Sequence, residues 1–205
     1  MAKELVSENA IVKLTPLLKS DVVLTPVLAE EWVGLNKIPL ATAYVLSEYF
    51  NLMVETEILQ AEKVSRTSGS GWHRLAFSPS FVGQVQKGQS YFLIDDTQTQ
   101  GGTFASLKGY IETNGGIVIG CYALTGKQYS TQLKLSQETL LTLRQHYESL
   151  EPFWQQTFGY GFDCLTESEA RFILNSRKDI EQIRTIILET RNAGLTQTIT
   201  NDDCS

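Results

Sequence analysis

Apolar runs separated by polar stretches predict several buried strands in the first part of the chain. Such runs occupy residues 22–24, 52–54, 91–94 and 117–124. Short continuous apolar runs are typical of parallel strands that are covered on both faces. After the second run, acidic residues alternate with Thr56 and Ile58, so we expect one face of that strand to meet water.

Segments with apolar residues at helical spacing lie between these runs. Residues 39–50 form one such segment, which begins with Pro39, a residue tolerated in the first helical turn. Residues 104–111 form another, and the Asn and Gly residues that follow favour a helix end. Strand, helix and strand in this order make a βαβ unit with a right-handed crossover. The pattern therefore predicts an α/β fold in which a parallel sheet is flanked by helices, with residues 29–37 as a loop.

From Ser136 onward the apolar period becomes helical. Ser136 is the predicted N-cap of the first of these helices, and Thr166 with Glu169 has the spacing of a capping box. The last helix is expected to end near Gly194. We therefore divide the chain into an α/β core over residues 1–130 and a helical C-terminal extension over residues 131–205. An aromatic cluster in the extension is interpreted as core rather than as a stacking platform for a base. Its members are Phe153, Trp154, Phe158, Tyr160 and Phe162.

Composition and charge narrow the classes of function. The 205 residues are 42% hydrophobic and 20% charged, as in ordinary globular proteins. A formal net charge of −6 argues against a protein that binds nucleic acid through a broad basic surface. The sequence shows neither a membrane span nor a secretory signal, and three scattered cysteines suit a reducing compartment. We expect a cytoplasmic protein with no nucleic-acid or membrane partner and no structural zinc site.

The strongest chemical signal is the stretch YFLIDDTQTQGGT at residues 91–103. A predicted buried strand delivers Asp95 and Asp96 to its carboxyl end, and a polar loop then turns into a helix near Thr103. Small residues in such a loop let backbone N–H groups converge on an anion, and the helix N-terminus adds partial positive charge. Two carboxylates beside a phosphate cradle suit a sugar phosphate and could help to hold Mg²⁺. The alternative, a surface turn whose acids cap a strand, does not explain why strand, acids, loop and helix occur together.

This stretch resembles the signature with which type I phosphoribosyltransferases bind 5-phosphoribosyl 1-pyrophosphate (PRPP). The shared features are an apolar strand, two acids and a Thr- and Gly-rich phosphate loop, and residues 105–126 continue like the next helix and strand of the family. Thr97, Gln98 and Gln100 depart from the residues usual at their positions. The resemblance implies a transferase of nucleotide metabolism, a Mg²⁺-dependent pentosyltransferase that moves ribose 5-phosphate from PRPP to a nitrogenous acceptor and releases pyrophosphate.

The resemblance also assigns tasks to single residues. Asp95 and Asp96 would hold the ribose, stabilise the charge that develops on it and bind Mg²⁺, directly or through water. The residues expected to hold the 5-phosphate are Thr99, Gln100, Gly101, Gly102 and Thr103. Residues 34–41, GLNKIPLA, look like the pyrophosphate-binding loop of orotate-type members, which makes Asn36 and Lys37 candidates for contacts to pyrophosphate.

Residues 60–80 form a long connection rich in Ser and Gly, which we interpret as a mobile lid. In the resembled family such a lid closes over PRPP and keeps water away from an oxocarbenium-like state. Lys63, His73 and Arg74 are the candidate catalytic residues of the lid, and Arg66 is a candidate pyrophosphate ligand. His73 could supply a proton near neutral pH. A surface loop with ordinary charges is the alternative.

The sequence leaves several questions open. Thr99 stands where members acting on 6-oxopurines carry an acid, so a pyrimidine, adenine or an unusual acceptor is favoured over hypoxanthine or guanine. A PRPP-binding regulator or sensor without turnover is the second hypothesis, and a different sugar-phosphate reaction on the same scaffold is the third. The oligomeric state is also open, a homodimer included.

Overall fold

The computed structural model describes residues 6–31, 34–61, 70–77, 79–98, 100–126 and 134–202. The chain divides into two compact units that alternate along the sequence. The first consists of Met1–Lys63, Pro79–Thr99 and Thr103–Thr131, and the second of Val64–Ser78, Gln100–Gly102 and Gln132–Ser205. The second unit thus takes in two segments that precede residue 130.

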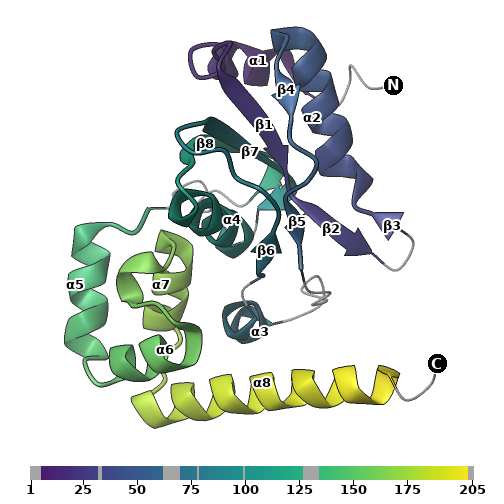
Figure 1. Ribbon diagram of the computed structural model, residues 1–205. Coiled ribbons are helices and arrows are strands. Elements are labelled where there is room, and N and C mark those ends of the chain that lie inside the picture. Colours follow the sequence, from purple (N-terminus) through teal and green to yellow (C-terminus); the bar gives the residue numbers. More distant parts are fainter. Residues whose placement is uncertain are drawn as a thin grey trace. The chain divides into compact units, whose positions relative to one another are not determined.

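The first unit is built on a four-stranded parallel sheet with the strand order β4-β1-β7-β8 (Figure 1). Its strands are β1 (Val22–Pro26), β4 (Met53–Val54), β7 (Ser90–Gln98) and β8 (Ile117–Gly126). Between β1 and β4 the chain forms α2 (Lys37–Phe50), and between β7 and β8 it forms α4 (Gly102–Thr113). The predicted α/β fold, a parallel sheet flanked by helices, is confirmed.

Side chains of β7 are buried on both faces of this sheet. Phe92 and Ile94 are fully buried in a cluster with residues of β1, α2 and the N-terminal helix α1 (Glu8–Leu14). On the other face, Gly116 leaves room for the side chains of Tyr91 and of Ile111 in α4. Burial on both faces explains why β7 has a continuous apolar run rather than an alternating pattern.

A second, small sheet has the strand order β3-β2-β5-β6 and was not predicted. It consists of β2 (Leu28–Glu31), β3 (Gly34–Leu35), β5 (Leu59–Gln60) and β6 (Phe81–Val82). The prediction of a loop over residues 29–37 was therefore wrong, because strands this short hold too few side chains to show a period. The strand predicted to continue beyond Val54 also ends there, and Glu55 instead accepts the backbone N–H of Glu57.

Strands β5 and β6 pair antiparallel and bring together the two ends of the predicted lid. Gln60 lies opposite Phe81, and the N–H of Ala61 donates to the carbonyl of Ser80 at 2.9 Å. Residues 62–69 and residue 78 lie outside the described residues, and with them Lys63 and Arg66. Mobility of the lid stays a prediction.

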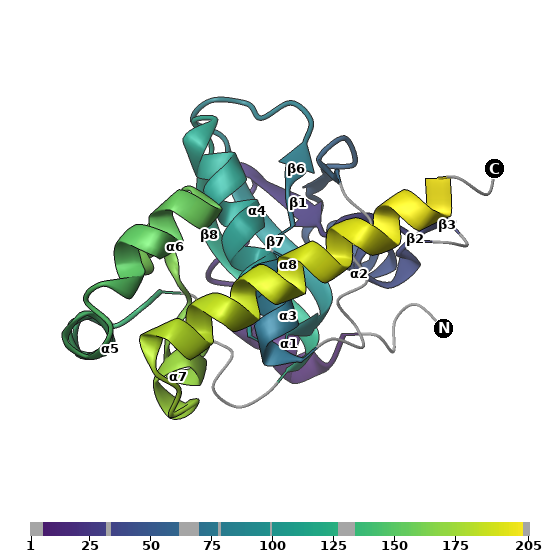
Figure 2. The same cartoon turned by 90° about the horizontal axis from the view of Figure 1, so that it is seen from below.

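The second unit is helical. Its helices are α3 (Gly71–Ala76), α5 (Gln137–His146), α6 (Leu150–Phe158), α7 (Glu167–Asn175) and α8 (Ile180–Asp202), with a 3₁₀ turn at Phe162–Cys164. Helices α3 and α8 lie side by side (Figures 1 and 2). Within the described part of the chain, no helix combines the length and the apolar character needed to cross a bilayer.

Several predictions for the helical part are confirmed. Ser136 caps α5 by accepting the N–H of Thr139, and Thr166 with Glu169 forms the predicted capping box. The aromatic cluster is core: Trp154 and Phe162 are fully buried, and the other members pack against the same cluster. The predicted end of the last helix was wrong, because α8 continues through Gly194 to Asp202. A single glycine weakens a helix without having to end it.

Candidate functional site

The acid pair lies where the strand order of the parallel sheet reverses. From β1 the chain moves outward to β4, whereas β7, on the other side of β1, leads outward to β8. Segments that leave β1 and β7 at their carboxyl ends therefore diverge, and open α/β sheets bind their ligands at such a point. Pairing with β1 stops at Pro26 opposite Ile94, and Asp95 and Asp96 follow directly.

The sequence suggested that β7 would end at Asp95 and Asp96, but the strand does not end there. It continues to Gln98 by pairing with β8, and Asp95 lies opposite Ala123. The acids therefore lie beyond the end of one neighbouring strand while the other still holds their backbone. This placement presents them at the sheet's carboxyl edge on a rigid element.

The two carboxylates have different surroundings. Asp95 is only 8% exposed, and its Oδ1 accepts the backbone N–H of Asp96 at 2.8 Å. Asp96 is half-buried, and its Oδ2 accepts a hydrogen bond from Nδ2 of Asn36 at 3.4 Å. Successive residues of a strand point to opposite faces, so the pair is not a ready-made chelate for one ion. The arrangement suits contacts to two neighbouring groups of one ligand.

Asn36 was predicted as a pyrophosphate contact, and the structure brings it to Asp96. It is the N-cap of α2, where its Oδ1 accepts the N–H of Ile38 at 3.3 Å. Its own N–H donates to the carbonyl of Ala29 at 3.0 Å, which ties the start of α2 to strand β2. Lys37 begins α2 and is exposed. The sequence gives no signal that this N-cap residue also hydrogen-bonds an acid 60 positions away.

The predicted phosphate loop connects β7 to α4. Thr99 lies outside the described residues. Gly101 has a φ of 81°, the left-handed region that glycine adopts without strain, and α4 begins at Gly102. Gln100 is held twice: Oγ1 of Thr166 donates to its carbonyl at 2.7 Å, and Nε of Arg74 donates to its Oε1 at 3.1 Å. Both contacts lie within the second unit.

His73 and Arg74, the described candidate catalytic residues of the predicted lid, lie on the short helix α3. Ser70 caps this helix by accepting the N–H of His73 at 3.2 Å. Leu75 and Ala76 of the same helix are buried in the core of the helical unit. Sequence reasoning missed α3, because six residues are too few for a helical period to be seen.

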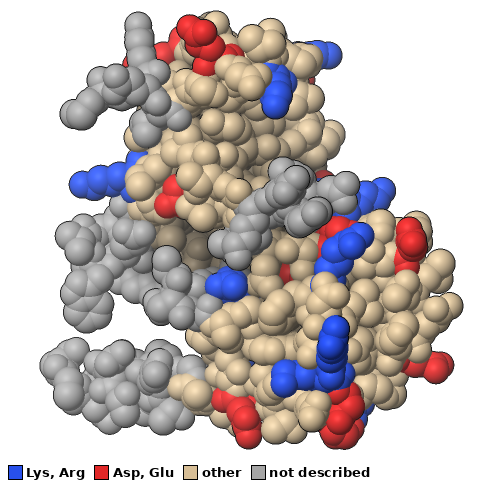
Figure 3. All heavy atoms as spheres, turned by 180° about the vertical axis from the view of Figure 1, so that it is seen from behind, with Lys and Arg blue, Asp and Glu red and all other residues tan. Residues whose placement is uncertain are grey.

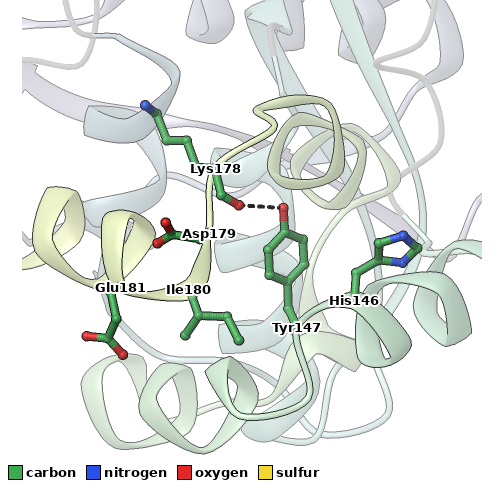
Figure 4. A pocket seen from close by; sticks show the side chains of 6 residues that line it. All are labelled: His146, Tyr147, Lys178, Asp179, Ile180 and Glu181. Carbon is green, nitrogen blue, oxygen red and sulfur yellow. Dashed lines mark hydrogen bonds between the residues drawn. The ribbon is translucent and has the colours of Figure 1, made fainter.

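A depression of about 510 Å³ lies elsewhere in the second unit (Figure 4). Its lining is His146, Tyr147, Lys178, Asp179, Ile180 and Glu181. The hydroxyl of Tyr147 donates to the carbonyl of Lys178 at 3.0 Å, and Nδ1 of His146 lies 2.9 Å from the carbonyl of Thr142. Charges of both signs line the depression, so its chemistry does not select a ligand.

Other chemical features point away from further sites. Among the described residues, no group of three or more His, Cys, Asp or Glu side chains could hold a metal ion. Burial raises the pKa of the Cys121 thiol to about 11, which makes it a poor nucleophile. On the face shown in Figure 3, Lys and Arg side chains are interspersed with Asp and Glu rather than gathered into one patch.

Comparison with known proteins gives two relatives and several structures of similar fold. No protein-family model matches the chain. The chain is 41% identical over 197 residues to the protein TraN of Escherichia coli. The aligned region covers 95% of this chain and 44% of TraN. The chain is also 54% identical over 112 residues to an uncharacterized protein of Haemophilus influenzae. That alignment covers 54% of this chain and 25% of the other protein. The chain thus spans less than half the length of these curated relatives.

Several of the similar structures are phosphoribosyltransferases. An adenine phosphoribosyltransferase of Saccharomyces cerevisiae has a TM-score of 0.39 and 14% identity, over 62% of this chain and 66% of that one. A hypoxanthine phosphoribosyltransferase of Staphylococcus aureus has a TM-score of 0.39 and 10% identity, over 63% and 65%. An adenine phosphoribosyltransferase of Thermoanaerobacter pseudethanolicus has a TM-score of 0.37 and 22% identity, over 57% and 65%. At these values the likeness carries no argument about chemistry.

Proposed function

We propose that the chain binds PRPP with Mg²⁺ at the carboxyl edge of its parallel sheet and transfers ribose 5-phosphate to a nitrogenous acceptor. One observation carries this proposal: Asp95 and Asp96 lie where the strand order reverses, and Asn36, the N-cap of α2, hydrogen-bonds Asp96. Carboxylates at this point of an α/β sheet lie where such sheets commonly bind their ligands, which supports the proposal.

The carboxylates would act on the ribose. Each accepts hydrogen bonds, which suits the neighbouring hydroxyls of the sugar. As the bond from C1 to the pyrophosphate oxygen breaks, positive charge develops on the ribose ring, and a carboxylate fixed beside it stabilises that charge. The lone pair of the acceptor nitrogen then forms the new bond to C1, the electron pair of the old bond leaves with pyrophosphate, and the nitrogen loses its proton.

The loop after β7 would hold the 5-phosphate. Gly101 in its left-handed conformation, Gly102 at the start of α4 and the hydroxyl of Thr103 offer donors to an anion, and the helix N-terminus favours negative charge. Gln100 and Thr99 complete the predicted set. Asn36, Lys37 and, from outside the described residues, Lys63 and Arg66 would meet the pyrophosphate.

Magnesium fits the donor set of the acid pair. Mg²⁺ keeps several of its waters and binds through one or two carboxylates together with the phosphates of its ligand. Because their side chains point to opposite faces, Asp95 and Asp96 would not chelate the ion as a pair, and each would contact it only in company with PRPP, directly or through water. The ion supplies neutralisation of the charge that grows on the departing pyrophosphate.

A PRPP-binding regulator without turnover is the second candidate, and one observation favours it. Arg74, a predicted lid cation, donates to Gln100, and the helix that carries it packs into the core of the second unit. A side chain held in this way has a structural task in addition to any contact with pyrophosphate.

Calorimetric titration with PRPP and Mg²⁺ tests the common part of both candidates. We expect binding to the unaltered chain, and a loss of at least about 100-fold in affinity, ~2.7 kcal/mol, when Asp95→Asn and Asp96→Asn are combined. Glu112→Gln is the control, because Glu112 is an exposed acid of α4 that pairs with Lys108. Unchanged affinity in the double variant would remove the proposal. Release of pyrophosphate from labelled PRPP with a panel of bases separates the transferase from the regulator.

A further inference from the structure

Thr166 is buried in the helical unit and contacts the predicted phosphate loop. Its side chain has no exposed surface. Its Oγ1 lies 2.7 Å from the carbonyl oxygen of Gln100 and accepts the N–H of Glu169 at 3.2 Å. The first contact joins residues that are 66 positions apart, whereas the second belongs to the capping box of α7.

The single proton of the Thr166 hydroxyl has two acceptors within reach. One is the Gln100 carbonyl, and the other is Oε2 of Glu169 at 3.0 Å. This carboxylate oxygen already receives the N–H of Thr166 at 2.9 Å, and the carbonyl is the closer of the two acceptors. The hydroxyl proton is therefore assigned to the hydrogen bond with the Gln100 carbonyl. A lone pair of Oγ1 of Thr166 accepts the N–H of Glu169, which completes the cap of α7.

Fixing this carbonyl also fixes the next amide. The peptide bond between Gln100 and Gly101 is planar and trans, so its C=O and its N–H point in opposite directions. When Thr166 draws the carbonyl to one side, the N–H of Gly101 faces the other. The carbonyl oxygen, which would repel an anion, is kept away from the side on which the N–H is presented.

Arg74 holds the same residue through its side chain. Gln100 stands where a small residue is usual in the family that the motif resembles, and a small residue could not receive this hydrogen bond from Arg74. The longer side chain at this position therefore has a structural reason. Backbone and side chain of Gln100 are both anchored within the second unit.

We propose that Thr166 is a positioning residue for phosphate binding: its hydroxyl sets the peptide plane that presents the Gly101 N–H to the 5-phosphate. The proposal rests on the proposed function, since the loop must receive a phosphate for this orientation to matter. It extends that function to the C-terminal helices, because the residue that orients the phosphate loop is the N-cap of α7.

The test is a titration of the full chain with ribose 5-phosphate, with pyrophosphate and with PRPP, each with Mg²⁺. Thr166→Val keeps the branched shape and cannot donate, and we expect it to weaken ribose 5-phosphate and PRPP about tenfold, ~1.4 kcal/mol. Pyrophosphate should bind as before, because the 5-phosphate loop does not contact it. Thr166→Ser keeps the hydroxyl and should restore the affinity.

Two further variants separate positioning from stability. Ser136→Ala removes the N-cap of α5 in the same unit and should leave all three affinities unchanged. Thr166→Ala removes the hydroxyl and adds neither volume nor charge, so it replaces Thr166→Val if that variant does not fold, with the same expected loss.

The outcomes distinguish the two proposals. If the unaltered chain binds neither PRPP nor ribose 5-phosphate, the proposed function fails, and the role of Thr166 fails with it. If the unaltered chain binds both and the non-donating variants bind them equally well, the role of Thr166 alone is overturned. An equal loss for pyrophosphate would also overturn it, because the effect would then be general rather than directed at the 5-phosphate.

Discussion

Both units bury carboxylates, and the partners of these carboxylates differ. In the helical unit, Glu167 is 3% exposed and Glu169 is 7% exposed, and both receive donors from the starts of helices. In the sheet unit, Asp95 is 8% exposed and lies within a strand whose backbone is already paired with β8. The acids of the helical unit complete helix ends, whereas Asp95 accepts the backbone N–H of Asp96 within its own strand, beyond the point where pairing with β1 stops. Burial alone therefore does not mark a functional acid, and the element that carries the acid has to be considered.

Glu167 shows what a structural carboxylate requires. Its two oxygens accept the N–H of Ser136 at 2.9 Å, the hydroxyl of Thr139 at 2.7 Å and Nε of Arg171 at 2.7 Å. Burial raises the pKa of Glu167, but these hydrogen bonds outweigh it, so the pKa lies below the ordinary value. Its charge is thus built into the connection between α5 and α7.

The largest effect on stability is expected at Glu167. Glu167→Gln replaces an oxygen acceptor by an NH₂ group and leaves a buried donor unpaired, so the free energy of unfolding should fall by roughly 3 kcal/mol. Asp95→Asn should change it by less than about 1 kcal/mol, because the amide keeps an Oδ1 that can accept the N–H of Asp96. Denaturant unfolding of both variants measures the difference. An equal loss of stability would break the comparison between the two acids.

The pH dependence sharpens the same prediction. A carboxyl whose pKa is lowered by folding stabilises the protein above its unfolded pKa, near 4.3 for Glu, and this contribution is lost as the pH falls through the folded pKa. The difference in unfolding free energy between the unaltered chain and Glu167→Gln should therefore be full at pH 6 and shrink below about pH 4. Glu181→Gln is the control, since Glu181 is an exposed acid that pairs with Arg184.

Local signals in the sequence were sufficient for much of the fold. The apolar run before Asp95 predicted β7, and the spacing of Thr166 and Glu169 predicted a capping box that the structure contains. These features are short-range, because periodicity and caps act over a few residues. The strand order that places the acid pair at a reversal is a long-range property and was not predictable in this way.

What the sequence missed depends on contacts between distant residues. Gln100 was predicted as a phosphate ligand, but nothing in the sequence linked it to Thr166 or to Arg74. Helix α3 was hidden in a stretch rich in Ser and Gly and is held by the burial of Leu75 and Ala76. Packing against the helical core, rather than helix propensity, explains its presence.

The next effect concerns His73 and Arg74 of α3 and separates a transferase from a regulator. In a transferase, His73→Ala and Arg74→Ala should each lower the rate of pyrophosphate release at least tenfold while PRPP affinity changes by less than about tenfold, ~1.4 kcal/mol. The reason is that charge on pyrophosphate grows as the bond breaks, so the Arg74 cation and a hydrogen-bond donor on His73 would act more strongly on the transition state. Arg74→Ala also loses its bond to Gln100, so the larger drop in affinity is expected there.

Steady-state release of pyrophosphate and calorimetry provide the two measurements. Arg144→Ala is the matched control, because Arg144 is a cation of the same unit and pairs with Glu151 rather than with Gln100. If both α3 variants release pyrophosphate at the unaltered rate, these residues belong with the structural groups of the helical unit. The groups that assist departure would then have to lie on the sheet side, beginning with Lys37.

A last prediction compares two cysteines, one from each unit, in a Cys204→Ser background. Cys121 lies in β8 opposite Leu93, and burial raises its pKa to about 11, whereas Cys164 is exposed. At pH 8 such a pKa leaves roughly one thiol in a thousand ionised, so Cys121 should react with an alkylating reagent on the order of 100-fold more slowly than Cys164. Mass spectrometry of the labelled peptides measures both rates, and the ratio should fall as the pH rises toward 11. Rapid labelling of Cys121 in the native protein would mean that β8 opens readily. The pairing of β7 with β8 would then hold the backbone of Asp95 less rigidly than we infer when we contrast Asp95 with Glu167.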